Sequence, residues 1–222
     1  MVYRHEWKHE ISACDVLVLR QRLRAVAKPD SHAPGGMSRI RSLYFDTPTD
    51  TALREKLDGV CNREKFRIRY YNGNTDFIRL EKKCKRGALG TKISCLVTKQ
   101  ETEALLRGDL AWMLDPDRPL LIELRAAMQS GLAPKVLVDY TREAFIYAPG
   151  NVRVTLDYDI RTSLQWEHFL DFHSMTLPVQ NDTKLLEVKW DAFLPSVIRD
   201  AVQLENRRAA AYSKYAACRV YG

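Results

Sequence analysis

Arginine and lysine occupy every second position of the segment 63–69, a spacing that could bind a chain of phosphates. Residues two apart lie on the same face of a β-strand. One face of this segment would therefore carry four positive charges, those of Arg63, Lys65, Arg67 and Arg69. Like charges on one strand face repel each other, and neighbouring charges that face water gain little stabilisation from each other. A concave face that holds a polyanion would explain such a pattern.

The same alternation recurs elsewhere in the chain. After a tight N-G-N turn, the segment 77–84 places Arg79, Glu81 and Lys83 on one face. Three further segments alternate in this way: 3–10, 152–163 and 185–191. A single charged face is usually just solvated. Its recurrence over several strands instead favours a shared anion-binding surface.

Carboxylates interrupt these basic faces at Glu6, Glu81, Asp157 and Glu187. Each could form salt bridges that orient the neighbouring Arg and Lys side chains and limit their repulsion. Each could instead hold Mg²⁺ or Mn²⁺, because these hard cations bind carboxylate and substrate phosphate oxygens together. The residues alone leave both roles open.

Turn and capping signals divide the chain into about eight strands with helices inserted between them. The expected strands cover residues 3–10, 38–47, 63–71, 77–84, 91–97, 135–147, 152–163 and 185–191. The expected helices cover 16–26 after an Asp15 cap, 50–57, 99–106 after a Thr98 cap, 118–128, 194–204 and about 206–221. Residues 85–90 read as a basic loop, and 165–181 could be a plug, a lid or an outer loop. Hairpin connections without a βαβ rhythm or a Gly-rich fingerprint predict an α+β fold with an antiparallel sheet or barrel.

Composition narrows the class of protein further. The 222 residues, 45% of them hydrophobic, suit one domain spanning 1–222, and the net charge of +7 favours anionic ligands. No apolar run is long enough for a membrane span, and the first ten residues lack the apolar region of a signal peptide. The five cysteines are odd in number and show no C-x-x-C spacing, which predicts a reducing, cytoplasmic environment.

An ordered set of motifs resembles a known family. The motifs are Y-R-H-E-W-K-H at 3–9, S-L-Y-F-D-T at 42–47, F-R-I-R-Y-Y at 66–71, L-E-K-K at 80–83, V-R-V-T-L-D at 152–157, L-E-V-K at 186–189 and S-K-Y at 213–215. Together they resemble the VTC domain, the polyphosphate polymerase domain of the triphosphate tunnel metalloenzyme (CYTH-like) superfamily. The resemblance implies an eight-stranded antiparallel β-tunnel, lined by basic residues and with helices packed outside. It also implies transfer of the γ-phosphate of ATP to inorganic polyphosphate with Mn²⁺ or Mg²⁺.

The motifs also imply roles for particular residues. The catalytic group would be Arg67, Arg69, Lys83 and Glu187. The phosphate ligands would be Lys8, Arg67, Arg69, Lys83, Lys92, Arg153, Lys189, Ser213 and Lys214. The metal ligands would be Glu187 and Glu6.

Two departures from the family pattern bear on the reaction. Hydrolases of the superfamily open with E-x-E-x-K, but Arg4 stands two positions before Glu6, which favours a polymerase over a triphosphatase. Near the C-terminus Arg208 would have to replace a basic residue that often precedes the S-K pair.

Three other functions stay open from the sequence. They are an inorganic or nucleoside triphosphatase, a non-catalytic sensor of polyphosphate or nucleotide, and a nucleic-acid binder. Nucleic acid is not expected, because Phe66 and Tyr70 lie on the face opposite Arg67 and Arg69, whereas stacking and phosphate contacts need to share a face. The residues do not specify the nucleotide, the metal or the oligomeric state.

Overall fold

The computed structural model describes residues 4–87, 89–179, 182–205, 207 and 212–219. Within this part of the chain, 10 strands form one antiparallel sheet. The strands are β1 (His5–Ile11), β2 (Lys28–Pro29), β3 (Met37–Asp46), β4 (Asn62–Tyr71), β5 (Asn74–Arg86), β6 (Leu89–Val97), β7 (Ala133–Tyr147), β8 (Val152–Ser163), β9 (Leu177–Pro178) and β10 (Lys184–Trp190). The α-helices are α1 (Ala13–Val26), α2 (Thr51–Leu57), α3 (Lys99–Leu106), α4 (Pro119–Gln129), α5 (Ser196–Val202) and α6 (Lys214–Cys218). Short 3₁₀ turns are η1 (Pro34–Gly36), η2 (Ala111–Met113), η3 (Pro149–Asn151) and η4 (Trp166–Leu170).

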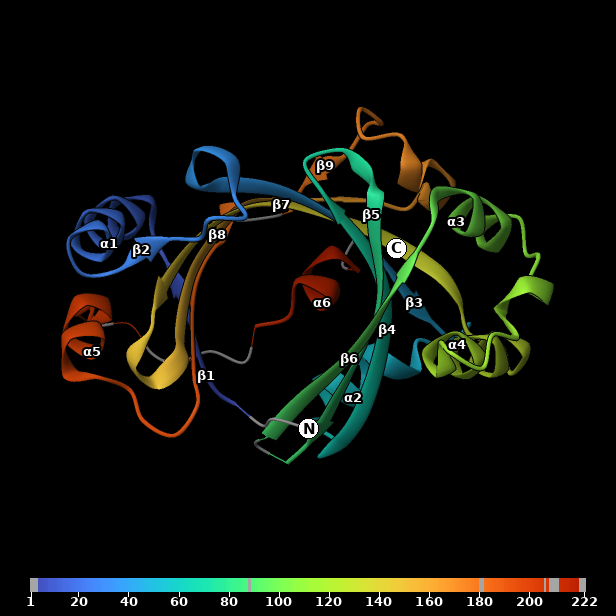
Figure 1. Cartoon of the computed structure of the whole chain (residues 1–222), viewed down its shortest axis with the longest axis horizontal. Helices are drawn as coiled ribbons and strands as arrows, with labels where there is room; N and C mark the ends of the chain where they lie inside the picture. The colour runs from blue at the N-terminus through green and yellow to red at the C-terminus, as the bar shows by residue number, and fades with distance from the viewer. Residues whose placement is uncertain (1–3, 88, 180–181, 206, 208–211, 220–222) are drawn as a thin grey trace.

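The sheet curves like an arch and is not closed by a continuous ladder (Figure 1). Its main path runs β1-β10-β8-β7-β3-β4-β5-β6, with β2 and β9 as short additions on β7 and β8. The edge strands β1 and β6 meet only at a bridge between Arg4 and Gly90 in the described residues. Because strands twist, two edges that cross at an angle can pair at one point without running side by side. The α+β antiparallel class is confirmed. The sheet has ten strands, eight of them on its main path, and it is not closed, so the closed eight-stranded barrel is not confirmed.

Helices cover the convex face of the sheet, and apolar side chains explain why they dock there. On one side Ile68 of β4 and Leu80 of β5 are fully buried with Leu121 and Leu124 of α4. On the other side α1 and α5 cover β8 and β10 (Figure 1). Each fully buried Leu or Ile side chain contributes roughly 1.5–3 kcal/mol, so these contacts hold the arch in shape.

The concave face is different, because α6 lies inside the arch (Figure 1). Tyr215 of α6 is buried against Tyr44, with ring centroids 5.3 Å apart, and its hydroxyl donates to the Asp46 carboxylate. Ser213 caps this helix by accepting from the Ala216 amide. A C-terminal helix was expected over about 206–221; α6 covers its described end, and residues 206, 208–211 and 220–222, with Arg208, lie outside the described residues.

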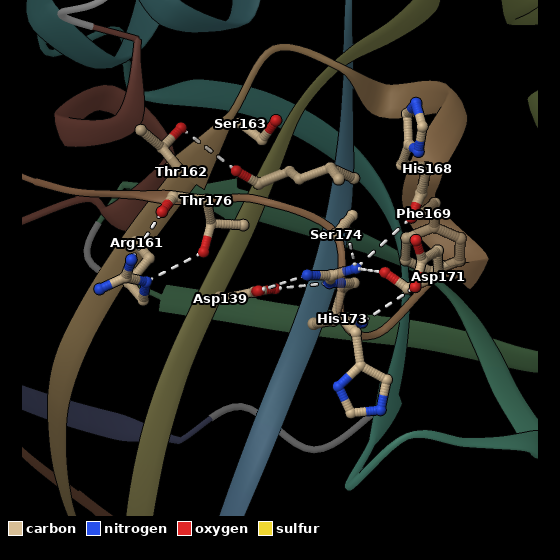
Figure 2. Close-up of polar contacts among 12 residues, drawn as sticks. Asp139, Arg161, Thr162, Ser163, His168, Phe169, Asp171, His173, Ser174 and Thr176 are labelled. Atoms are coloured by element: carbon tan, nitrogen blue, oxygen red, sulfur yellow. Dashed lines mark hydrogen bonds and ion pairs between the residues drawn. The ribbon is translucent and has the colours of Figure 1, made fainter.

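The segment 165–181, which the sequence left unassigned, forms η4 and β9. The part from η4 to Thr176 lies on the outer face, whereas Val179 packs in the inner cluster with Tyr215. The buried Arg41 of β3 pairs with Asp139 and donates to the Ser174 hydroxyl at 2.8 Å. Figure 2 shows Arg161 of β8 joined to Thr176 of the same segment. Phe169 packs in the outer core and accepts the Tyr70 hydroxyl through its carbonyl. Up to Thr176 the segment is therefore an outer loop, and residues 180–181 lie outside the described residues.

Smaller differences concern the ends of elements. Ser12, not Asp15, is the N-cap of α1, and Asp15 is the third helical residue that completes a capping box. The stretch expected as a basic loop at 85–90 is mostly strand, because β5 and β6 continue pairing to Arg86 and Leu89. Among the described helices, none combines the length and the apolar character that a membrane crossing requires.

Candidate functional site

A cavity of about 440 Å³ opens on the concave face of the sheet, and charged side chains dominate its walls. We call it the basic cavity. Its cations are Lys8, Lys56, Arg63, Lys65, Arg67, Lys83, Lys85, Arg142, Lys189 and Lys214. Glu6 and Glu187 line it as well, together with the aromatic residues Trp7, Tyr44, Tyr140, Tyr212 and Tyr215. Charged side chains gather here because successive residues of a strand point to opposite faces, and the apolar residues of the same strands pack in the outer cores.

Glu81 of β5 organises one wall of the basic cavity. This carboxylate is 1% exposed and accepts from Arg67 Nε at 2.8 Å, Arg69 Nη2 at 2.7 Å and Lys92 Nζ at 2.9 Å. Burial alone would raise the pKa of Glu81, but the three cations lower it well below its usual range. The ionised carboxylate fixes both guanidinium groups, and Arg67 Nη1 also donates to the Tyr44 hydroxyl at 2.9 Å.

Two lysines and two glutamates alternate across the β1–β10 pair. Lys8 lies opposite Glu187, and Glu6 lies opposite Lys189. Lys8 Nζ is 3.2 Å from Glu6 Oε2 and 3.4 Å from Glu187 Oε2, and Lys189 contacts both carboxylates too. Burial would raise the pKa of Glu187, but Lys189 and Lys8 lower it well below its usual range. Burial and Glu187 would raise the pKa of Glu6, but the neighbouring lysines lower it overall. Both carboxylates are therefore anionic at neutral pH, and both line the cavity.

These two carboxylates fit a partial site for a divalent cation. Among the described residues no three His, Cys, Asp or Glu side chains gather as a complete protein-only metal site. Mg²⁺ and similar hard cations commonly bind one or two carboxylates and complete their shell with water and substrate phosphate. Glu6 and Glu187 share both of their lysine neighbours, so they lie close enough to act together. The donor set therefore suits a cation that arrives with phosphate.

A third buried carboxylate, Asp157 of β8, pairs with two cations, of which the motifs predicted Lys214 but not Arg142. Arg142 of β7 pairs with it through Nε at 2.6 Å and Nη2 at 2.7 Å, and Lys214 of α6 lies 2.5 Å away. The Tyr140 ring lies beneath both cations, at 5.3 Å from Arg142 and 4.7 Å from Lys214. Burial would raise the pKa of Tyr140, but these cations lower it overall. Arg142 and Tyr140 were missed, because they stand in a segment, 135–147, that carries apolar residues on both faces.

Most of the residues that the motifs singled out come together here. Those that line the basic cavity are Glu6, Lys8, Arg67, Lys83, Glu187, Lys189, Ser213 and Lys214. Arg69 and Lys92 lie next to it through Glu81. Arg153 lies apart: it pairs with Asp30 at 2.9 Å and lines a second cavity beside β2 and the β7–β8 turn. Their roles as phosphate and metal ligands stay predictions.

Lys65 gives a prediction for pH dependence. Burial, together with Arg63 and Lys56, lowers the pKa of Lys65 to about 8. A bound anion would raise that pKa, so we expect binding of tripolyphosphate to take up protons at about pH 8 and to weaken as the pH rises further. The stability of the free protein depends on pH in the opposite direction. Burial of the charged Lys65, together with repulsion by its neighbours, destabilises the fold at low pH, and this cost is relieved between about pH 8 and the ordinary pKa of 10.5.

Calorimetry in buffers of different ionisation enthalpy would measure this proton uptake. Lys65→Arg is the matched control, because arginine stays charged throughout this range. Ionisation of the ligand itself is common to both proteins and cancels in the comparison. Equal proton uptake by the two proteins would contradict the prediction.

Comparison with known proteins agrees with this architecture. The VTC domain matches residues 3–221, so the chain belongs to the VTC domain family. The solved PH1012 protein from Pyrococcus horikoshii OT3 shares 14% identity with a TM-score of 0.53, covering 95% of this chain and 96% of that one. A putative adenylate cyclase from Bacillus halodurans shares 17% identity with a TM-score of 0.50, covering 84% of this chain and 81% of that one. At these identities the two structures indicate a common fold only, and no curated protein matches the sequence.

Proposed function

We propose that this VTC domain is a polyphosphate polymerase that transfers the γ-phosphoryl group of ATP to the end of an inorganic polyphosphate chain. The observation that carries the proposal is the convergence of carboxylate-anchored cations on one cavity. Arg67, Arg142 and Lys214 are each held by a buried acid and each line the same space of about 440 Å³. Phosphoryl transfer asks a protein chiefly for alignment and charge neutralisation, which such a wall supplies.

In this proposal the terminal phosphate oxygen of the chain attacks the γ-phosphorus of ATP. The bond from that phosphorus to the β–γ bridging oxygen breaks, and ADP leaves with the electron pair. Arg67 would grip phosphate oxygens with two N–H groups, since Glu81 and the Tyr44 hydroxyl already fix its plane. Arg69, which contacts Glu81 through Nη2 beside the cavity, would add positive charge. Lys8 and the half-exposed Lys83 would act as mobile point charges.

Glu187 and Glu6 would hold Mn²⁺ or Mg²⁺. When bound, such a cation would neutralise phosphate charge that builds up during transfer. Lys8 and Lys189 contact both carboxylates in the free protein. They would therefore lie close enough to bind the same phosphates as the cation. Ser213, which caps α6, lines the same cavity and would donate its hydroxyl hydrogen to a phosphate oxygen.

The test is incubation with ATP, Mn²⁺ and a short polyphosphate primer. ADP, free phosphate and chain length are measured together by chromatography and gel electrophoresis. Polymerase activity gives ADP, lengthening chains and little free phosphate. ADP with an equal amount of free phosphate and no chains would instead identify a triphosphatase. Binding of ATP and polyphosphate without any ADP would identify a sensor, and either result would overturn the polymerase.

A further inference from the structure

One row of residues crosses five strands of the sheet and joins the basic cavity to the second cavity. Directly opposite residues of an antiparallel pair share a face, with their Cα atoms about 4.5–5.5 Å apart. The strand registers give the row as Glu6 of β1, Lys189 of β10, Arg153 of β8, Ile146 of β7 and Lys28 of β2. Glu6 and Lys189 line the basic cavity, whereas Arg153, Ile146 and Lys28 line the second cavity. The two cavities therefore adjoin where Lys189 faces Arg153.

The second cavity differs from the basic cavity in the character of its walls. Its volume of about 680 Å³ lies within the range of roughly 300–1,000 Å³ that is typical of small-molecule sites. Such sites combine apolar walls with a few polar groups that orient the ligand. The apolar residues that line this cavity are Val26, Ala27, Pro29, Ile146, Ala148 and Pro149. Among its polar residues Asp30 is buried, with 8% of its surface exposed.

Asp30 is fixed as a hydrogen-bond acceptor. Its Oδ1 accepts from the His32 backbone amide at 3.1 Å, and Arg153 Nη2 lies 2.9 Å from its Oδ2. Burial would raise the pKa of Asp30, but hydrogen bonds from His32 and the charge of Arg153 lower it overall. An ionised carboxylate accepts hydrogen bonds at several lone pairs, so Asp30 has capacity for further donors. Ribose hydroxyls are donors of this kind, and acidic residues accept from them in dinucleotide-binding folds.

These walls do not suit a phosphate chain. Apolar groups offer phosphate oxygens no hydrogen-bond donors, and the ionised Asp30 repels them. The walls do suit the uncharged end of a nucleotide, since apolar side chains can contact a base while Asp30 accepts from the ribose. Arg153 and Lys189, where the two cavities adjoin, are placed to bind the phosphate next to the ribose.

We infer that the second cavity binds the nucleoside of the ATP donor, whose triphosphate enters the basic cavity beside Lys189. The inference rests on the proposed function, and it assigns the part of the donor that the basic cavity does not contact. It also gives the donor a direction: the nucleoside lies at the β7–β8 turn, and the γ-phosphate points toward Glu187 and Arg142. Arg153 then contacts the nucleotide from outside the basic cavity.

The variant Ile146→Trp tests the site, because it fills part of the second cavity without changing any charge. Titration calorimetry with the metal chelated compares ATP with methyl triphosphate, which carries a triphosphate but no nucleoside. In the unaltered protein we expect ATP to bind about tenfold more tightly than methyl triphosphate, or better. In Ile146→Trp the two affinities should agree within about threefold, through a loss for ATP alone. Ala148→Trp, at an exposed position of the β7–β8 turn, provides a second variant with the same expected result.

Leu17→Trp is the matched control, since Leu17 is an exposed residue of α1 and lines neither cavity. The affinity for methyl triphosphate shows in every variant whether the basic cavity is intact. Equal affinities for ATP and methyl triphosphate in the unaltered protein would overturn the inference. So would a preference for ATP that survives in both cavity variants, or one that Leu17→Trp loses as well.

The same titrations separate this inference from the proposed function. A protein that prefers ATP but forms no ADP would count against the polymerase reaction only, since the preference is measured without turnover. A protein that lengthens polyphosphate chains but does not prefer ATP over methyl triphosphate would keep the polymerase and lose the nucleoside site. Binding of neither ligand would reject both.

Discussion

Replacing Arg67 with alanine is expected to weaken tripolyphosphate binding by roughly 30- to 150-fold, which corresponds to about 2–3 kcal/mol for a charge-assisted contact. Arg67 contributes this much because it is fixed before the ligand arrives. Glu81 and the Tyr44 hydroxyl hold its guanidinium, so little side-chain freedom is lost on binding. Lys83→Ala should have a similar effect through lost charge. Titration calorimetry with tripolyphosphate measures both.

The fold should survive the Arg67 substitution. Glu81 keeps Arg69 and Lys92 as partners, so the buried carboxylate is not left alone. Arg67→Lys separates charge from geometry, because lysine keeps the charge but loses the two-pronged donor; its affinity should fall between those of the other two proteins. Arg107→Ala on α3 controls for net charge. Tight tripolyphosphate binding by a folded Arg67→Ala protein would remove Arg67 from the proposed site.

Alternation in the sequence predicted the charged face of β4 because the period of a strand is independent of its surroundings. Arg63, Lys65 and Arg67 do line one cavity, as that period requires. The ordered motifs predicted the family, and matches at Glu6, Lys8 and Glu187 brought two strands together that are distant in sequence. Local pattern and motif order were therefore enough for most of the candidate site.

Arg142 and Tyr140 were harder to find because β7 is apolar on both faces. Val136 and Val138 face the inner cluster with Tyr215, whereas Leu137 faces the outer core. Helix α6 lies inside the arch and packs on the inner face of β7, so this face is apolar too. The alternation of polar and apolar residues that would mark Tyr140 and Arg142 is therefore absent. The packing of β7 against α6 could not be predicted from the sequence of β7 alone, since α6 lies far along the chain.

The surroundings of Arg153 and the position of the segment 165–181 could not be predicted, for a different reason. Arg153 fits the alternation of polar and apolar residues along β8. Its side chain nevertheless pairs with Asp30 and lines a second cavity at the β7–β8 turn. The sequence around Arg41 does not distinguish it from the other basic residues of the strands. In the structure it is 1% exposed, pairs with Asp139 and donates to Ser174 of the segment 165–179. Periodicity predicts which face of the sheet a residue lies on. It does not predict which cavity the residue lines or which partner it contacts, because tertiary contacts determine both.

Replacing Glu187 with glutamine is expected to abolish most metal-dependent turnover of ATP, with a loss of about 100-fold or more if the carboxylate holds the cation. The affinity for tripolyphosphate without metal should not fall with the activity. Glu187 competes with phosphate for Lys8 and Lys189, so its neutral amide should leave the affinity equal or higher. This opposite response separates a metal ligand from a residue that merely shapes the cavity.

Two measurements on the same variant check this expectation: ADP formation with Mn²⁺, and calorimetric titration of tripolyphosphate with the metal chelated. Glu167→Gln, an exposed carboxylate on the outer loop, serves as the matched control. Full turnover by Glu187→Gln would exclude its role in holding the cation. A parallel loss of metal-free anion binding would show that Glu187 works by positioning Lys8 and Lys189. The decisive quantity is therefore the sign of the change in metal-free affinity, since both roles predict lower activity.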